Sequence, residues 1–153
     1  MTAIKTAAFL AAGLVLGITV APGLAAEFEI RMLNKGEKGV MVFEPDFVRA
    51  QPGDTIKFVS VDPGHNAETI KGMLPVGAAA FPSKVSKDLS VTLTEEGVYG
   101  VKCTPHYGMG MIALIAVGEP VNGEAAAGVK HPGKAKKHFA TLFEALPEKL
   151  AAK

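Results

Sequence analysis

Hydrophobic and polar residues largely alternate in several short segments of this chain. The segments are 28–33, 47–50, 55–61, 90–94 and 98–103. Successive side chains of a β-strand point to opposite faces, so alternation predicts strands with one buried face. Turn sequences such as Pro52-Gly53-Asp54 separate the segments. This arrangement is typical of an all-β sandwich or barrel.

The segment 111–117 is apolar at every position. A strand with one solvent-exposed face should alternate, so we expect this strand to be covered on both faces. The C-terminal tail can provide one cover, because its apolar residues recur at the spacing of one helix face. These residues are Ala135, Phe139, Leu142, Phe143 and Leu146. Residues 124–129 predict a shorter helix before it, and residues 74–82 predict a helical turn.

The first residues have the pattern of an export signal. Lys5 supplies the charged start, residues 7–20 are apolar, and small residues follow. The apolar run is short and ends at a cleavage-like site after Ala25 or Ala26, which favours a cleaved signal over a membrane helix. We therefore interpret residues 1–25 as a signal peptide and expect a periplasmic protein.

The rest of the chain, about 127 residues, has the size of one domain. We divide it into a β-sandwich at 26–118 and a helical extension at 119–153 that packs on the same domain. The whole chain carries 16 basic and 15 acidic residues, and this balance argues against nucleic-acid binding. We expect a monomer without a membrane anchor, and we interpret the tail lysines as a solvated helix face.

The chain has one cysteine, Cys103, which cannot form a disulfide within the chain. A free thiol in an exported protein is open to oxidation, and binding a metal as a thiolate would protect it. The alternative is a buried, inert cysteine. The neighbouring residues favour a metal, because His106 follows three positions later, and Met109 and Met111 follow six and eight positions later.

Thiolate, imidazole and thioether groups in one loop are soft donors, and soft donors select copper. A second histidine, His65, lies 38 positions before the cysteine. Two histidines and one cysteine in a plane, with a weak axial methionine, form the site of a blue-copper electron carrier. Cys103 would donate the thiolate to one copper ion, His65 and His106 would complete the plane, and the methionine would tune the reduction potential.

Met109 and Met111 compete for the axial position. Met111 opens the apolar strand, whose rigid backbone can hold a long axial distance, so we favour Met111. Met109 lies between two glycines at the crest of the loop, where an exposed side chain suits a docking patch. Pro105 has no N–H group to donate to the thiolate and stiffens the turn. Asn66 can join the two ligand segments through its side-chain amide.

Other chemistries fit these residues less well. A catalytic Cys–His pair needs an orienting third group and an oxyanion site, and a structural zinc site rarely uses methionine. A saturated ligand sphere leaves no open position for a substrate, so we expect no enzymatic activity. The alternative function is a periplasmic copper-binding or copper-delivery protein, although the repeated methionines or paired cysteines of such proteins are absent.

In its candidate copper ligands and the residues around them, the chain resembles the cupredoxins. It shares the C-x-x-H-x-x-x-x-M loop with plastocyanin. The resemblance covers almost the whole mature chain and is carried by residues 32–36, 41–45, 64–66, 101–106 and 109–117. It implies a Greek-key β-sandwich of about eight strands with two C-terminal α-helices. It also implies that the copper ligands are His65, Cys103, His106 and Met111.

The resemblance further implies a periplasmic carrier that passes single electrons to nitrite reductase in denitrification, with a cytochrome as a possible donor. Such carriers dock through an apolar patch around the exposed ligand histidine, ringed by lysines. The residues that match this docking surface are Lys35, Lys71, Lys84, Lys102 and Met109. Pro63 and Pro82 stand where lysines are common, which weakens the expected electrostatic steering.

Overall fold

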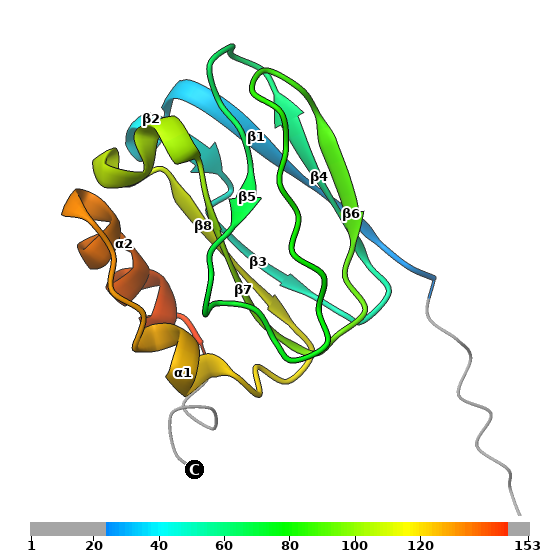
Figure 1. Ribbon diagram of the computed structural model, residues 1–153. Coiled ribbons are helices and arrows are strands. Elements are labelled where there is room, and N and C mark those ends of the chain that lie inside the picture. The colour runs from blue at the N-terminus through cyan, green and yellow to red at the C-terminus, as the bar shows by residue number, and fades with distance from the viewer. Residues whose placement is uncertain (1–23, 147–153) are drawn as a thin grey trace, which may run out of the picture.

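The computed structural model describes residues 24–146, which form a two-sheet sandwich with helices on one side (Figure 1). The strands are β1 (Glu27–Gly36), β2 (Gly39–Glu44), β3 (Phe47–Ala50), β4 (Thr55–Ser60), β5 (Glu68–Thr69), β6 (Leu89–Thr92), β7 (Gly97–Lys102) and β8 (Ile112–Val117). A 3-10 helix, η1 (Thr104–Met109), joins β7 to β8. The α-helices are α1 (Gly123–Ala127) and α2 (Gly133–Glu144).

The two sheets have the strand orders β2-β1-β4-β6 and β3-β8-β7-β5. Strand β1 pairs with β4 in parallel and with β2 in antiparallel fashion, and β8 pairs in parallel with β3 and antiparallel with β7. The inward side chains of both sheets, including Ile30, Phe58 and Ile115, form one buried core. Alternation puts these residues on the inner faces, because the side-chain period of a strand is two. The all-β sandwich with two C-terminal helices is therefore confirmed.

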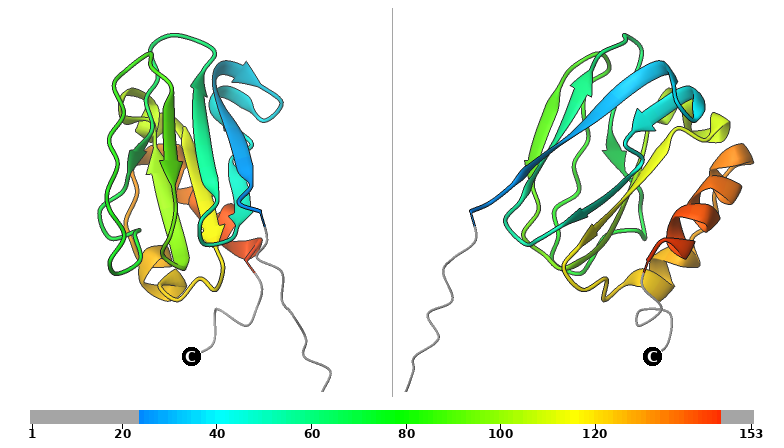
Figure 2. Two further views of the ribbon diagram at one scale, coloured as in Figure 1. Left: turned by 90° about the vertical axis from the view of Figure 1, so that its right-hand side faces the viewer. Right: turned by 180° about the vertical axis from the view of Figure 1, so that it is seen from behind.

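Strand β8 is buried along its whole length, as its unbroken apolar sequence predicts. Ala113 and Ile115 face the sandwich core, whereas Ile112 and Leu114 contact the buried face of α2. That face includes Phe139, which is 1% exposed. The three layers, helices, helix-covered sheet and outer sheet, follow one another from left to right in Figure 1 and from right to left in the rear view of Figure 2.

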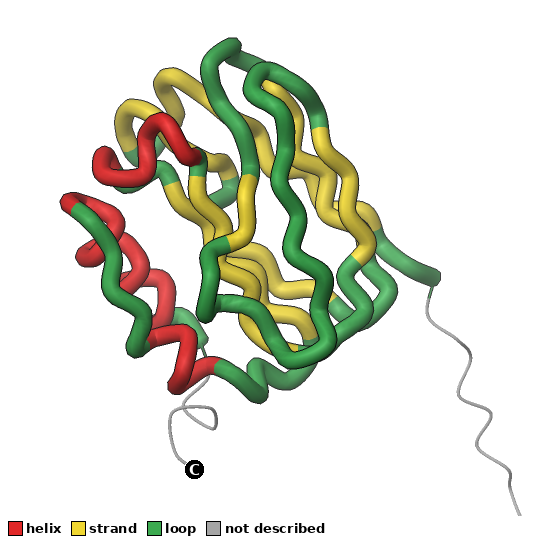
Figure 3. Tube along the Cα trace, viewed as in Figure 1, coloured by secondary structure: helices red, strands yellow, loops and turns green. Residues whose placement is uncertain are grey.

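Several local features differ from the prediction. Residues 39–44 form β2, although the segment does not alternate cleanly, and Met41 has a positive φ of 54° within it. The expected helical turn at 74–82 is wrong: those residues form turns and an irregular loop, drawn green in Figure 3. Prolines at both ends and Gly77, with a φ of 88°, favour turns over a helix there. Most of the predicted signal, residues 1–23, lies outside the described residues.

Between residues 24 and 146, the helices are too short or too polar to span a lipid bilayer.

Candidate metal centre

The four predicted ligands come from two loops, β4–β5 and β7–β8, that meet at one end of the sandwich. His65 lies in the loop between β4 and β5, Cys103 directly follows β7, and Met111 directly precedes β8. His106 lies within η1, the short helix at the upper left of Figure 1. The antiparallel pairing of β7 with β8 brings the two ends of this loop together, and the Cys103 N–H group donates to the Met111 carbonyl at 3.0 Å.

Three ligand atoms form a small triangle. The Nδ1 atoms of His65 and His106 are 3.1 Å apart, and the Cys103 Sγ atom lies 3.7 Å from the first and 3.5 Å from the second. The centre of such a triangle is about 2 Å from each corner, which is the length of a bond between a metal and an imidazole nitrogen. The residues present therefore fit a metal ion held by two imidazoles and one thiolate.

His65 is held in the tautomer that metal binding requires. Its Nε2 atom lies 2.9 Å from Asn34 Oδ1, an oxygen that can only accept, so Nε2 carries the hydrogen and Nδ1 keeps its lone pair. Burial, and next the nearby charge of His106, lower the pKa of His65. A neutral imidazole is favoured at the site, and only the neutral form binds a metal.

Cys103 is completely buried, and its burial raises the pKa of the thiol. The backbone N–H groups of Asn66 and His106 act in the opposite direction and lower the pKa, which favours the thiolate. These two donors come from the two segments that carry the histidines. The sulfur is therefore prepared for a cation that would offset the cost of burying its charge.

The two candidate axial methionines differ in exposure and in backbone contacts. Met111 is completely buried, whereas Met109 is 47% exposed at the end of η1. The Met111 N–H group donates to the His106 carbonyl at 3.3 Å, so its backbone is joined to a ligand segment. Met111 is therefore buried with its backbone joined to a ligand segment, whereas Met109 lies at the surface.

Asn66 connects the two loops of the site. Its Oδ1 atom accepts a hydrogen bond of 2.8 Å from the Thr104 N–H group, and its Nδ2 atom lies 3.4 Å from both Ser83 O and Thr104 Oγ1. Pro105 occupies the first turn of η1, where no backbone donor is needed. Both residues border the ligands without contributing a soft donor.

The lysines expected on the docking surface lie at different depths and positions. Lys35 and Lys84 are exposed, and the Ser86 N–H group donates to the His65 carbonyl at 2.8 Å, which holds the loop of Lys84 beside the site. Lys102 is partly buried, pairs with Glu68 at 3.4 Å and lies over the Tyr107 ring. Lys71 is exposed and follows Ile70, which pairs with Gly100, so it is farther from the loop than Lys102 is.

Three polar residues near the site have no role that the sequence assigns. Asn34 precedes the β1–β2 turn, and its only sequence signal is its membership of the segment shared with the cupredoxins. His131 and His138 lie in the basic tail and carry no ligand spacing of their own. The His131 Nδ1 atom lies 2.6 Å from the Tyr107 hydroxyl, and both ring nitrogens of His138 have partners at 2.8 Å. No sequence pattern indicates these long-range pairs.

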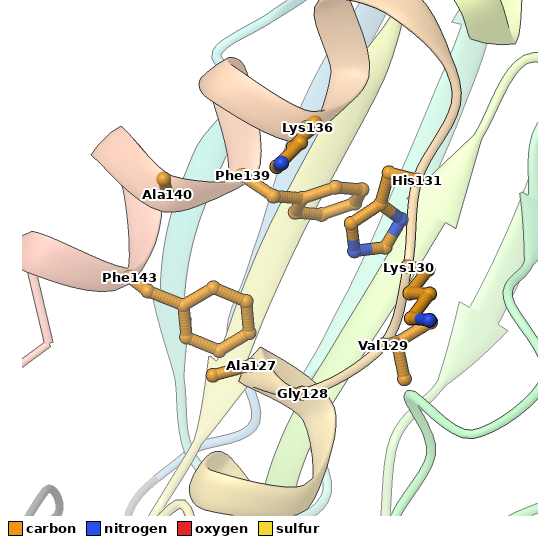
Figure 4. A pocket seen from close by; sticks show the side chains of 9 residues that line it. All are labelled: Ala127, Gly128, Val129, Lys130, His131, Lys136, Phe139, Ala140 and Phe143. Carbon is orange, nitrogen blue, oxygen red and sulfur yellow. The ribbon is translucent and has the colours of Figure 1, made fainter.

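The hollow between α1 and α2 is separate from the metal centre (Figure 4). Its volume is about 580 Å³, and it is lined by Phe139, Phe143 and His131 among others. None of the four predicted ligands lines it. Apolar side chains dominate its walls, so it contributes no donors to the copper chemistry.

Comparison with known proteins identifies the family. A family model described as copper binding proteins of the plastocyanin/azurin family matches residues 30–118. A pseudoazurin of Paracoccus pantotrophus is 55% identical over 130 residues, which are 84% of this chain and 90% of that relative. The chain belongs to the pseudoazurin family. Pseudoazurins are copper proteins of electron transfer, and the grouped side chains of His65, Cys103 and His106 agree with this membership. Copper is therefore the cofactor of this chain.

Solved pseudoazurin structures have the same fold. The crystal structure of pseudoazurin from Methylobacterium extorquens AM1 aligns with a TM-score of 0.77 at 48% identity, and it covers 79% of this chain and 99% of its own. Native pseudoazurin from Hyphomicrobium denitrificans aligns with a TM-score of 0.76 at 41% identity, covering 80% and 99%. The sandwich and its C-terminal helices are therefore shared features of the pseudoazurins, which carry electrons rather than catalyse reactions.

Proposed function

We propose that the protein is a mononuclear blue-copper electron carrier of the periplasm, with the ligands His65, Cys103, His106 and Met111. The triangle of the two Nδ1 atoms and the Cys103 sulfur is the observation that carries this proposal. A copper ion bound there supplies a one-electron couple. Met111 is the axial residue in this proposal, because it is buried and its backbone is hydrogen-bonded to Cys103 and His106, whereas Met109 is exposed.

The surrounding residues keep the ligand geometry fixed. Asn34 holds the His65 ring through its Nε2 atom, and Asn66 ties the His65 loop to the start of η1. Ligands that are fixed before the metal binds change little between the two oxidation states, and a small change favours rapid electron transfer. Binding copper requires the thiolate of Cys103, so loading releases a proton from that buried thiol.

The more exposed side of the metal centre is the side through which an electron would enter and leave. His106 is the less buried of the two histidines, and Met109 lies at the surface beside it. We propose that a redox partner docks over this surface and is guided by Lys35, Lys71, Lys84 and Lys102. Nitrite reductase is the acceptor we propose, and a cytochrome is the donor.

The proposal includes export and domain organisation. Residues 1–25 are removed as a signal peptide, residues 26–118 form the sandwich, and residues 119–153 extend it. The packing of α2 against β8 supports one domain for the last two parts. The working protein is a monomer with no enzymatic activity of its own, because four ligands leave no position for a substrate.

The visible absorption spectrum of the oxidised, copper-loaded protein tests this function. We expect an intense band toward the red end of the spectrum from charge transfer between the Cys103 thiolate and Cu(II). Cys103→Ala should remove the band and Met109→Ala should keep it. A wild-type protein that binds copper without the band would overturn the proposal. Slow electron self-exchange with ready transfer of copper to an apo-acceptor would indicate the alternative, a copper-delivery protein.

A further inference from the structure

His138, in α2, is hydrogen-bonded through both ring nitrogens. Its Nδ1 atom lies 2.8 Å from the Gly110 carbonyl oxygen, and its Nε2 atom lies 2.8 Å from Asp46 Oδ2. A carbonyl and a carboxylate only accept, so both ring nitrogens must donate. The geometry therefore corresponds to an imidazolium ion.

Asp46 is a rigid and well-connected partner for this cation. Its side chain is 5% exposed and also accepts hydrogen bonds from Lys38 Nζ at 2.6 and 2.8 Å. Its backbone carbonyl accepts the Leu114 N–H group at 2.9 Å, which fixes Asp46 to β8. The carboxylate is thus shared by two cations, and its residue is anchored to β8, an inner strand of the helix-covered sheet. Burial alone would raise the pKa of Asp46, but the bonds from His138 and Lys38 lower it overall.

The second hydrogen bond of His138, to Gly110, reaches the loop of the metal centre. Gly110 ends η1 with a φ of 95° and separates the exposed Met109 from the buried Met111. The peptide group between Gly110 and Met111 is planar, so holding its carbonyl also orients its N–H group. His138 binds that carbonyl, and the His106 carbonyl accepts the N–H group at 3.3 Å.

We propose that His138 is a positioning residue of the copper site, which sets the Gly110–Met111 peptide and through it the axial methionine. This inference rests on the proposed function, in which Met111 is the axial ligand. The axial ligand of such a site tunes its reduction potential, so a shift of the Met111 backbone would change that potential. Asp46 and Lys38 hold His138 in the orientation that the bond to Gly110 requires.

His138→Leu is the main test, because leucine has neither donor. In the metal-free protein, amide hydrogen exchange at Met111 should become about tenfold faster or more, the effect expected for losing one charge-assisted hydrogen bond. In the copper-loaded protein, the reduction potential and the relative intensities of the visible bands should both shift. His138→Arg should restore these values toward wild type, since the guanidinium keeps the charge and can donate to both oxygens.

Lys137→Gln is the matched control, because Lys137 is the preceding residue of α2 and is exposed, so this change removes one positive charge without touching Gly110. Equal exchange rates, potentials and spectra in His138→Leu and in this control would overturn the proposal, even if the leucine variant were less stable. If His138→Leu does not fold, His138→Phe gives the same comparison, because phenylalanine also has neither donor. A colourless wild type would defeat the proposed function, whereas the exchange rates in metal-free protein would still decide the role of His138.

Discussion

At the scale of single residues, Met109 and Met111 lie only two residues apart, but only one of them is the axial ligand in the proposed function. Met111 is buried and joined by its backbone to Cys103 and His106, whereas Met109 is 47% exposed. In the proposed function, the buried thioether of Met111 is the axial ligand, and the exposed thioether of Met109 belongs to the docking surface. The two residues should therefore control different properties of the protein.

Met111→Gln should retain copper but lower its reduction potential, because a harder oxygen ligand favours Cu(II). Met109→Gln should leave the potential nearly unchanged and slow association with the redox partner. Potentiometry and second-order electron-transfer rates measure the two effects. The assignment of the axial ligand is wrong if the potential responds to Met109 instead.

Asn34 should matter for copper affinity although it is not a ligand. Removing an acceptor bound to a ligand histidine typically costs 10–100-fold in metal affinity. Asn34→Ala should therefore weaken copper binding by about that factor, and Asn34→Asp should weaken it less because an acceptor oxygen remains. Competition with a chelator measures the change. Equal affinity in the alanine variant and the wild type would mean that the His65 ring is held by its packing alone.

At the scale of elements, α2 is both a cover and a support. Its buried face includes Ala135, Phe139 and Leu142, which pack against β8. The same helix contacts η1 and provides His138 to Gly110. Loss of packing along α2 should therefore lower the stability of the domain and loosen the loop that holds the metal.

Phe139→Ala should lower the free energy of unfolding by about 3–5 kcal/mol, because it removes a fully buried aromatic ring and leaves a cavity. Urea unfolding of the metal-free protein measures this from the midpoint at constant slope. Thr141→Ala, at an exposed position of the same helix, should change the stability by less than about 0.5 kcal/mol. A small effect of Phe139→Ala would show that α2 contributes little to the fold.

The link between α2 and the sandwich should depend on pH. The hydrogen bond to Asp46 raises the pKa of His138 above its ordinary value of 6.5, so this contribution is complete below pH 6.5 and is lost as the pH rises through the raised value. The pKa of Asp46 is lowered from 3.8, so its contribution is lost only as the pH falls through that lower value. The pair is therefore strongest between these two ordinary values, and Lys38 and Lys134 are the other charges that face it.

Unfolding midpoints measured from pH 5 to pH 9 test this dependence in the metal-free protein. The wild type should lose stability on the alkaline side, and His138→Arg should not, because arginine stays charged. A decline of equal size in both proteins would place the titrating group elsewhere.

At the scale of the whole molecule, charge near the metal centre is local rather than global. The chain has a formal net charge of +1, so steering of a partner must come from the distribution of lysines. Lys134, one of the tail lysines that we interpret as a solvated helix face, lines the same hollow as Met109 and is therefore close to the copper loop. Lys57 lies on β4, in the sheet away from the helices, and provides a better control.

Lys35→Glu or Lys84→Glu should slow association with an acidic redox partner without changing the spectrum or the potential. Lys57→Glu should have a much smaller effect. Salt should reduce the differences, since the Debye length is about 10 Å at 0.1 M. Electron-transfer rates against ionic strength measure this. Equal effects at all three positions, or rates that do not vary with salt, would place the docking surface elsewhere.

Local periodicity in the sequence is enough to predict the strand pattern, the doubly covered β8 and the amphipathic α2. The sequence also identified a soft donor set, since Cys103 and His106 lie in one short loop. It did not reveal β2, whose apolar residues do not alternate.

The groups that support the ligands become visible only in the folded chain. His65 is 31 positions from Asn34, and His138 is 92 positions from Asp46. A sequence shows periodicity within an element, but contacts between distant segments depend on how the sheets pair and where α2 packs. Those long-range contacts orient His65 and anchor the Gly110–Met111 peptide. The types of ligand can therefore be read from short stretches of sequence, whereas their geometry depends on contacts between distant segments.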